Sequence, residues 1–129
     1  MPTANEKLDL AYRHLEKVLD AWDAPTDWDD LAVYGFYCLE NAVDAAGMHL
    51  GLPTPKNHFM RAQLASELHT QHDLPDVEPL LRDLNEARKA AAYGDVEAPD
   101  LDAETIATQI EVYLDAVSRL LEEEDDDVE

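Results

Sequence analysis

The chain has 129 residues, of which 46% are hydrophobic, and its 30 Asp and Glu residues against nine Lys and Arg residues give a formal net charge of −21 at pH 7. A chain of this length is typical of one domain with a single apolar core, so intrinsic disorder is not the expected state. The charge disfavours a general nucleic-acid-binding surface, because a uniform negative field repels phosphate backbones.

The sequence also indicates a compartment. Cys38 is the one cysteine, so no intrachain disulfide can form, which fits a reducing environment. No apolar run approaches the roughly 20 residues that cross a bilayer. The N-terminal residues lack a basic segment followed by an apolar one, so they do not resemble a secretory signal. We therefore expect a cytoplasmic protein with no membrane contact.

Apolar residues at three- and four-residue steps predict a first helix over about 5–22. A second helix is predicted over about 27–50, with Thr26 as its N-cap and acidic residues in its first turn. Apolar residues cover several faces of this second helix, which predicts that it is central or shared with a second subunit. The segment 51–55, with two prolines, ends it.

Three further helices are predicted over about 56–72, 77–92 and 102–122. In the third, Phe59 is expected to face the core together with Ala62, Leu64, Ala65 and Leu68. With no strand-like alternation, five helices and short connections predict an all-α, up-and-down antiparallel bundle. We expect the bundle over residues 1–121, followed by an acidic disordered tail over 122–129.

The charge is unevenly distributed. Between His49 and Tyr93 there are five cationic and six anionic residues, which leaves −1, so the flanks carry the remaining −20 of the total −21. The same span holds four of the five histidines. The middle of the chain is therefore locally near neutral, in contrast to its acidic flanks.

Three segments of the sequence resemble the HEPN domains, small all-helical proteins of prokaryotic toxin–antitoxin and defence loci. The first is the aromatic-rich YGFYCLENAVDAAGMHLG in the second helix, and the second is Lys56-Asn57-His58 at the start of the third. The last is LRDLNEARKAAAYGD, from Leu81 to Asp95, followed by a spaced final helix. Together the resemblance covers roughly residues 5–121.

The resemblance implies a homodimer formed around the second and fourth helices. Active members of the family are metal-independent ribonucleases whose signature is an Arg followed, after four to six residues, by a His. Arg88 matches the arginine, but Tyr93 stands where the His is expected. Imidazole can accept the 2′-hydroxyl proton near neutral pH, whereas a tyrosine with a pKa near 10 is a poor base.

Two functions follow as hypotheses. The favoured one is a non-catalytic or degenerate dimeric module that binds a nucleotide, RNA or a protein partner, such as a nucleotidyltransferase-type antitoxin, through Arg88, Lys89 and Lys56. The alternative is a ribonuclease toxin in which Arg88 acts with Tyr93 or His58. An acidic scaffold without a ligand is a third interpretation.

Each candidate residue also has a structural interpretation. Arg88 and Lys89 can stabilise a helix dipole at a C-terminus. Tyr93 can cover the core with its ring, and His58 can satisfy backbone groups in a first helical turn. Cys38 is expected to be a buried thiol rather than a nucleophile. His69 and His72 share a helix face, yet no converging third or fourth ligand is recognisable, so neither a metal site nor a cofactor is expected.

Overall fold

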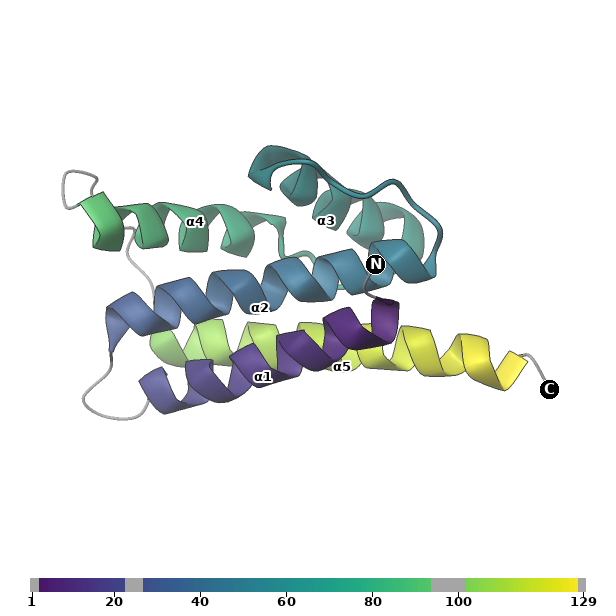
Figure 1. The fold of residues 1–129 in the computed structure, drawn as a ribbon, viewed down its shortest axis with the longest axis horizontal. Coiled ribbons are helices and arrows are strands. Elements are labelled where there is room, and N and C mark those ends of the chain that lie inside the picture. The colour runs from purple at the N-terminus through teal and green to yellow at the C-terminus, as the bar shows by residue number, and fades with distance from the viewer. Residues whose placement is uncertain (1–2, 23–26, 94–101, 128–129) are drawn as a thin grey trace.

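The computed structural model describes residues 3–22, 27–93 and 102–127, without the side chains of Ala91, Tyr93 and residues 123–127. Within these ranges the chain forms five helices and no strand (Figure 1). They are α1 (Ala4–Trp22), α2 (Trp28–His49), α3 (His58–His72), α4 (Glu78–Tyr93) and α5 (Ala103–Asp127). The predicted all-α bundle is confirmed. None of these helices is both long enough and apolar enough to span a bilayer.

The helix α2 lies in the middle of the bundle. It contacts each of the other four helices, with α3 and α4 on one side and α1 and α5 on the other (Figure 1). Its buried residues are distributed around the whole helix rather than along one stripe. The apolar character that predicted a central or shared helix is therefore explained by burial within one chain.

The direction of α3 differs from the predicted alternation. His58 contacts Glu40, Arg61 contacts Asp44, and Leu64 lies against Gly47, so residue numbers rise together along α2 and α3. The two helices are parallel, and the strictly antiparallel arrangement was a wrong prediction at this point. Residues 50–57 make this possible, because eight extended residues span up to about 26 Å. That exceeds the length of α3, whose 15 residues measure about 22 Å.

Capping residues set the helix starts. Asp27 caps α2, its side chain accepting a hydrogen bond from the Asp30 amide; Thr26, the predicted cap, lies outside the described residues. Asn57 caps α3 by accepting from the Met60 amide at 2.8 Å, so α3 begins at His58 rather than at Lys56. The helix α5 continues to Asp127, past the predicted end at Glu122. The division into a bundle over 1–121 and a tail over 122–129 stays a prediction.

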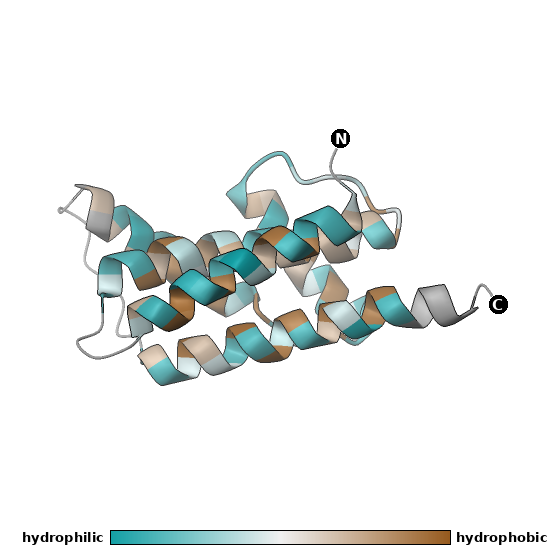
Figure 2. Cartoon of the chain, turned by 60° about the horizontal axis from the view of Figure 1, so that its bottom comes forward, coloured by the Kyte–Doolittle hydropathy of each residue, from teal (hydrophilic) through white to brown (hydrophobic). Residues whose placement is uncertain are grey.

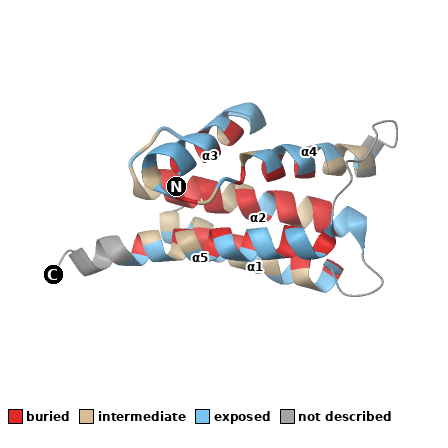
Figure 3. Ribbon diagram, turned by 180° about the vertical axis from the view of Figure 1, so that it is seen from behind, coloured by how far each residue is buried: buried red, intermediate tan, exposed pale blue. Residues whose placement is uncertain are grey.

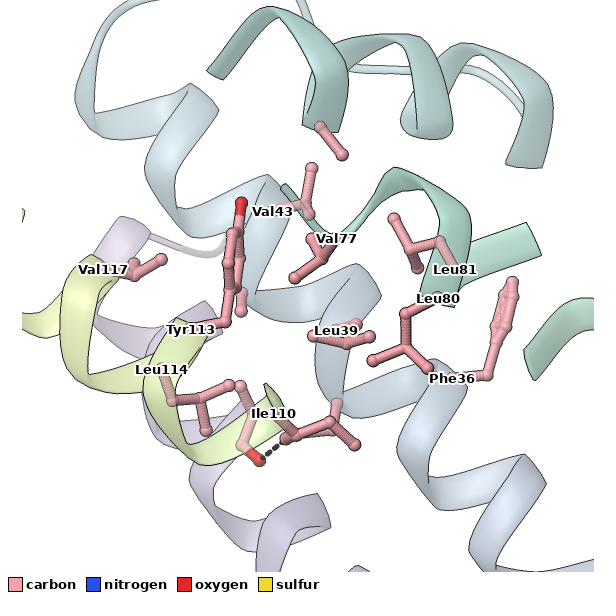
Figure 4. Close-up of a cluster of buried hydrophobic side chains, with 14 of the residues drawn as sticks. Phe36, Leu39, Val43, Val77, Leu80, Leu81, Ile110, Tyr113, Leu114 and Val117 are labelled. Atoms are coloured by element: carbon pink, nitrogen blue, oxygen red, sulfur yellow. Dashed lines mark hydrogen bonds between the residues drawn. The ribbon is translucent and has the colours of Figure 1, made fainter. Parts of the chain in front are cut away.

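The core lies where α2 meets α4 and α5. Brown apolar and teal polar residues alternate along the outer helices, as expected for amphipathic helices that cover one shared core (Figure 2). The apolar faces bring Phe36, Leu39 and Val43 of α2 against side chains of α4 and α5 (Figure 4). Tyr113 is fully buried in this cluster, and its hydroxyl has no hydrogen-bond partner among the described residues.

Phe59 is the exception to the predicted core. Its side chain is 64% exposed, whereas Ala62, Leu64, Ala65 and Leu68 of the same helix are buried as expected. The first turn of α3 lies at the edge of the α2 contact, and its outward side is exposed (Figure 3). Helical spacing alone placed Phe59 on the inner face, but no described element covers it.

Candidate functional site

The groove between α2, α3 and α4 holds two of the five predicted site residues. It has a volume of about 560 Å³, within the range of small-molecule sites. Its floor is largely apolar, and its lining includes His58, Lys89 and the exposed Phe59. Lys56 is exposed but is not one of the lining residues. The groove therefore brings together two of the predicted residues, whereas Lys56 and Arg88 are not among its lining residues.

The ring of Phe36 connects two candidates that are 30 positions apart, His58 and Arg88. The His58 imidazole lies edge-on to this ring at 5.0 Å between centroids. The Arg88 guanidinium carbon lies 5.1 Å from the centroid of the same ring, a cation–π distance. The structure thus places both on one aromatic side chain of α2, which the sequence did not identify as part of a site.

His58 is oriented by a carboxylate. Its Nδ1 lies 2.8 Å from Glu40 Oε2, and its side chain is 49% exposed. Since an ionised carboxylate only accepts hydrogen bonds, Nδ1 carries the proton and donates it. The other ring nitrogen, Nε2, is then the basic one. Glu40 therefore selects the tautomer in which Nε2 can accept a proton.

Arg61 is the centre of an ionic cluster that the sequence analysis missed. Its Nε and Nη2 donate to the two oxygens of Asp44 at 2.9 and 3.3 Å, and its Nη1 donates to Glu40 Oε2 at 2.6 Å. Lys7 of α1 approaches Asp44 Oδ2 at 3.8 Å. Because the Asp44 side chain is only 8% exposed, these contacts hold charged groups almost out of water. The cluster links α1, α2 and α3.

Burial lowers the pKa of the Arg61 guanidinium, but the hydrogen bonds and charges of Asp44 and Glu40 outweigh burial and raise this pKa above its ordinary value. Arg61 therefore stays charged and fully engaged. One signal in the sequence could have revealed the cluster. Glu40 and Asp44 are four apart on a largely apolar helix, so they share a face that α2 must either expose or neutralise.

The exposed cations of α4 are paired within their own helix. Arg82 contacts Glu78, and Lys89 Nζ lies 3.5 Å from Glu86 Oε1. Such exposed pairs one turn apart contribute little to stability and leave the charges accessible. Lys89 is thus accessible in the groove lining although it is paired with Glu86.

Arg88 differs from the other arginines of this region. Its Nη2 donates to Asn85 Oδ1 at 2.8 Å, and its Nε is buried without a hydrogen-bond partner. Among the described residues no carboxylate forms an ion pair with it. A half-buried guanidinium with an unsatisfied donor and no anion is the most distinctive electrostatic feature of the groove region.

The remaining candidates are placed as follows. Tyr93 ends α4, and its side chain lies outside the described residues. Cys38 is buried, its thiol donates to the Ala11 carbonyl at 3.1 Å, and burial raises its pKa to about 12. The predicted structural thiol is confirmed. His69 Nδ1 donates to the Leu74 carbonyl at 2.8 Å. No cluster of three metal-ligating side chains occurs in the described parts of the chain.

No known family model, curated protein or solved structure matches this sequence. The resemblance to HEPN domains therefore remains a prediction.

Proposed function

We propose that this chain is a HEPN-like, dimeric helical module of a toxin–antitoxin or defence system that binds the phosphate of a nucleotide or of RNA and does not cleave it. The observation that supports this function is the state of Arg88. In a chain with 30 acidic residues, this half-buried guanidinium has no carboxylate partner among the described residues. A nucleotidyltransferase-type antitoxin is the protein partner that this setting suggests.

The physical argument concerns the cost of the unpaired cation. Burying a charged donor without a partner is unfavourable, and folding leaves Arg88 Nε in that state. A phosphate supplies two acceptor oxygens to the guanidinium in a fork geometry. The contact with the Phe36 ring already restricts the guanidinium, so less side-chain entropy is lost when an anion binds.

Isothermal titration with 5′-AMP and with a short oligoribonucleotide tests this function. We expect Arg88→Met to weaken binding at least about tenfold, because charge-assisted hydrogen bonds contribute about 1.5–3 kcal/mol. Methionine keeps an unbranched stem against Phe36. Arg119→Met removes the same charge from an exposed position of α5, outside the lining of the groove, and should change affinity less than threefold or so. Equal binding by the wild type and Arg88→Met would rule out Arg88 as the anion site.

A second candidate is a metal-independent ribonuclease that uses Arg88 with His58 or Tyr93. The contact of His58 and Arg88 with the same ring and the orientation of His58 by Glu40 favour His58 as the base. Its Nε2 would take the 2′-hydroxyl proton, while Arg88 would neutralise charge on the phosphate. Cleavage assays that detect 2′,3′-cyclic phosphate ends test this, with His58→Gln expected to abolish them. Tyr93→Phe distinguishes the tyrosine variant.

A further inference from the structure

The outer face of α3 carries almost no charge. Its exposed residues are His58, Phe59, Met60, Gln63, Ser66, Glu67, His69, Thr70 and Gln71, of which Glu67 alone is formally charged at neutral pH. On α1, by contrast, six exposed residues are charged, namely Glu6, Asp9, Arg13, Glu16, Lys17 and Asp20. A chain that keeps itself soluble with acidic residues therefore leaves one helix face without them.

This uncharged face also exposes large apolar side chains. Phe59, at 64%, is the most exposed of the described large apolar side chains, and its neighbour Met60 is 40% exposed. Protein interfaces are enriched in aromatic residues and Met and depleted of charged residues at their centre. In its low charge and its exposed Phe59 and Met60, the α3 outer face therefore resembles the centre of an interface.

A groove begins at Met60 on the same helix, whereas Phe59 lines the groove between α2, α3 and α4. It lies between α3 and the segment Pro53–Pro55, has a volume of about 720 Å³, and extends along α3 from Met60 to His72. In a twofold contact each copy uses the same patch, so protruding side chains and the groove that receives them must occur together on it. Here the exposed Phe59 lies next to the N-terminal end of the groove, and the groove continues to the C-terminal end of α3.

We infer that the outer face of α3 is the surface through which two copies of this chain associate, with the two α3 helices antiparallel. The inference rests on the dimeric part of the proposed function and assigns its interface. The net charge of the chain indicates which partner binds this face. Two bodies of −21 repel one another wherever their acidic surfaces meet, so they can approach only through an uncharged face. A basic partner, by contrast, would gain most from the acidic faces.

This surface differs from the one that the HEPN resemblance implies. The helix α2 is covered by α1, α3, α4 and α5, and its exposed residues are Trp28, Asp29, Asp30 and Tyr37. Little of α2 remains for a second copy. The outer side of α3, in contrast, is turned away from the rest of the bundle (Figures 1 and 3).

Sedimentation equilibrium of the full chain, at protein concentrations between about 1 and about 500 µM, gives the dimer dissociation constant. We expect Thr70→Glu to raise this constant at least about tenfold, because each copy then places a carboxylate in the contact. Thr108→Glu in α5 is the matched control, since it is the same substitution at an exposed position with the same net charge. It should leave the constant within about twofold.

Salt gives an independent measurement. Raising NaCl from about 0.1 to 1 M shortens the Debye length from about 10 to 3 Å and should tighten the dimer, because repulsion between the acidic bodies is screened. A basic partner would instead be released by salt. A monomer at every concentration and salt level, or equal effects of Thr70→Glu and Thr108→Glu, would overturn the inference. Titration of 5′-AMP into Thr70→Glu separates the two proposals. A monomeric Thr70→Glu variant that still binds 5′-AMP has lost dimerisation and kept anion binding.

Discussion

Two arginines, one at the α2–α3 contact and one at the α2–α4 contact, are treated in opposite ways. Arg61 donates from three nitrogens to Glu40 and Asp44, and its side chain is 16% exposed. Arg88 lies over the Phe36 ring, donates to one amide oxygen and keeps a buried Nε that has no partner among the described residues. The first is fully engaged by the fold, and the second keeps a donor that no described residue satisfies.

The comparison shows why charge alone does not mark a site. Both arginines are cations on helices that pack against α2. Arg61 lines the groove, and Arg88 contacts Phe36, which also lines it. The two arginines differ in their hydrogen-bond partners, because a cation whose donors are all satisfied has no free donor for a ligand. Tyr113 extends the comparison to the core, where a hydroxyl is unsatisfied and lies too deep for any ligand.

The largest effect is expected from removing the engaged arginine. Arg61→Met leaves Asp44 and Glu40 nearly buried and short of their main counter-charge, so the free energy of unfolding should fall by about 3 kcal/mol. Urea denaturation at pH 7 measures this. The loss follows from the charges left behind rather than from the packing of the stem, which methionine retains.

Two variants sharpen the interpretation of that loss. Arg82→Met removes an exposed arginine that is paired only within α4, and its effect should stay within about 0.5 kcal/mol. Adding Glu40→Gln and Asp44→Asn to Arg61→Met should restore part of the stability, because no uncompensated charge remains. An additive loss in that triple variant would contradict the role assigned to the ionic cluster.

The intermediate effect concerns the unsatisfied hydroxyl of the core. Tyr113→Phe removes a buried hydroxyl that has no partner among the described residues and keeps the ring, so it should raise the free energy of unfolding by about 1 kcal/mol. Thermal and urea unfolding measure the change. Tyr12→Phe is the control, because the Tyr12 hydroxyl donates to Asp115 Oδ1 at 3.4 Å and its loss should not stabilise. A destabilised Tyr113→Phe would indicate a hydrogen bond to a buried water.

The sequence was sufficient for the helices but not for their directions. Apolar spacing and proline-containing turns located all five helices, because those signals act within each segment. The parallel docking of α3 depends on Arg61 meeting Asp44 and on Leu64 approaching Gly47, where an added Cβ would lie 3.0 Å from Leu64 Cδ2. These are contacts between segments, and a linker of eight residues allows either direction.

The site was predictable only in part, for the same reason. Arg88, Lys89 and His58 were identified as residues of the right chemical type, and the fold brings His58 and Arg88 onto Phe36. Which arginine is paired, however, depends on where carboxylates from another helix lie. Local sequence contains no such information, and it also failed to show that Phe59 lies outside the core.

The smallest effect belongs to a buried group that is satisfied, the thiol of Cys38. Burial raises its pKa to about 12, so the folded chain keeps the thiol protonated at a pH where the unfolded chain, with its ordinary pKa near 9, releases the proton. The folded state then binds more protons than the unfolded state, so stability falls as pH rises above about 9. By pH 10 this effect lowers the free energy of unfolding by about 1 kcal/mol, and at pH 7 there is no such loss. Urea midpoints between pH 7 and 10 should therefore decline more steeply in the wild type than in Cys38→Ala. The same comparison in the Tyr113→Phe background removes the other buried core group whose pKa is raised. If the urea midpoints with Cys38 and with Cys38→Ala then fall in parallel with pH, the thiol is not held protonated by the fold.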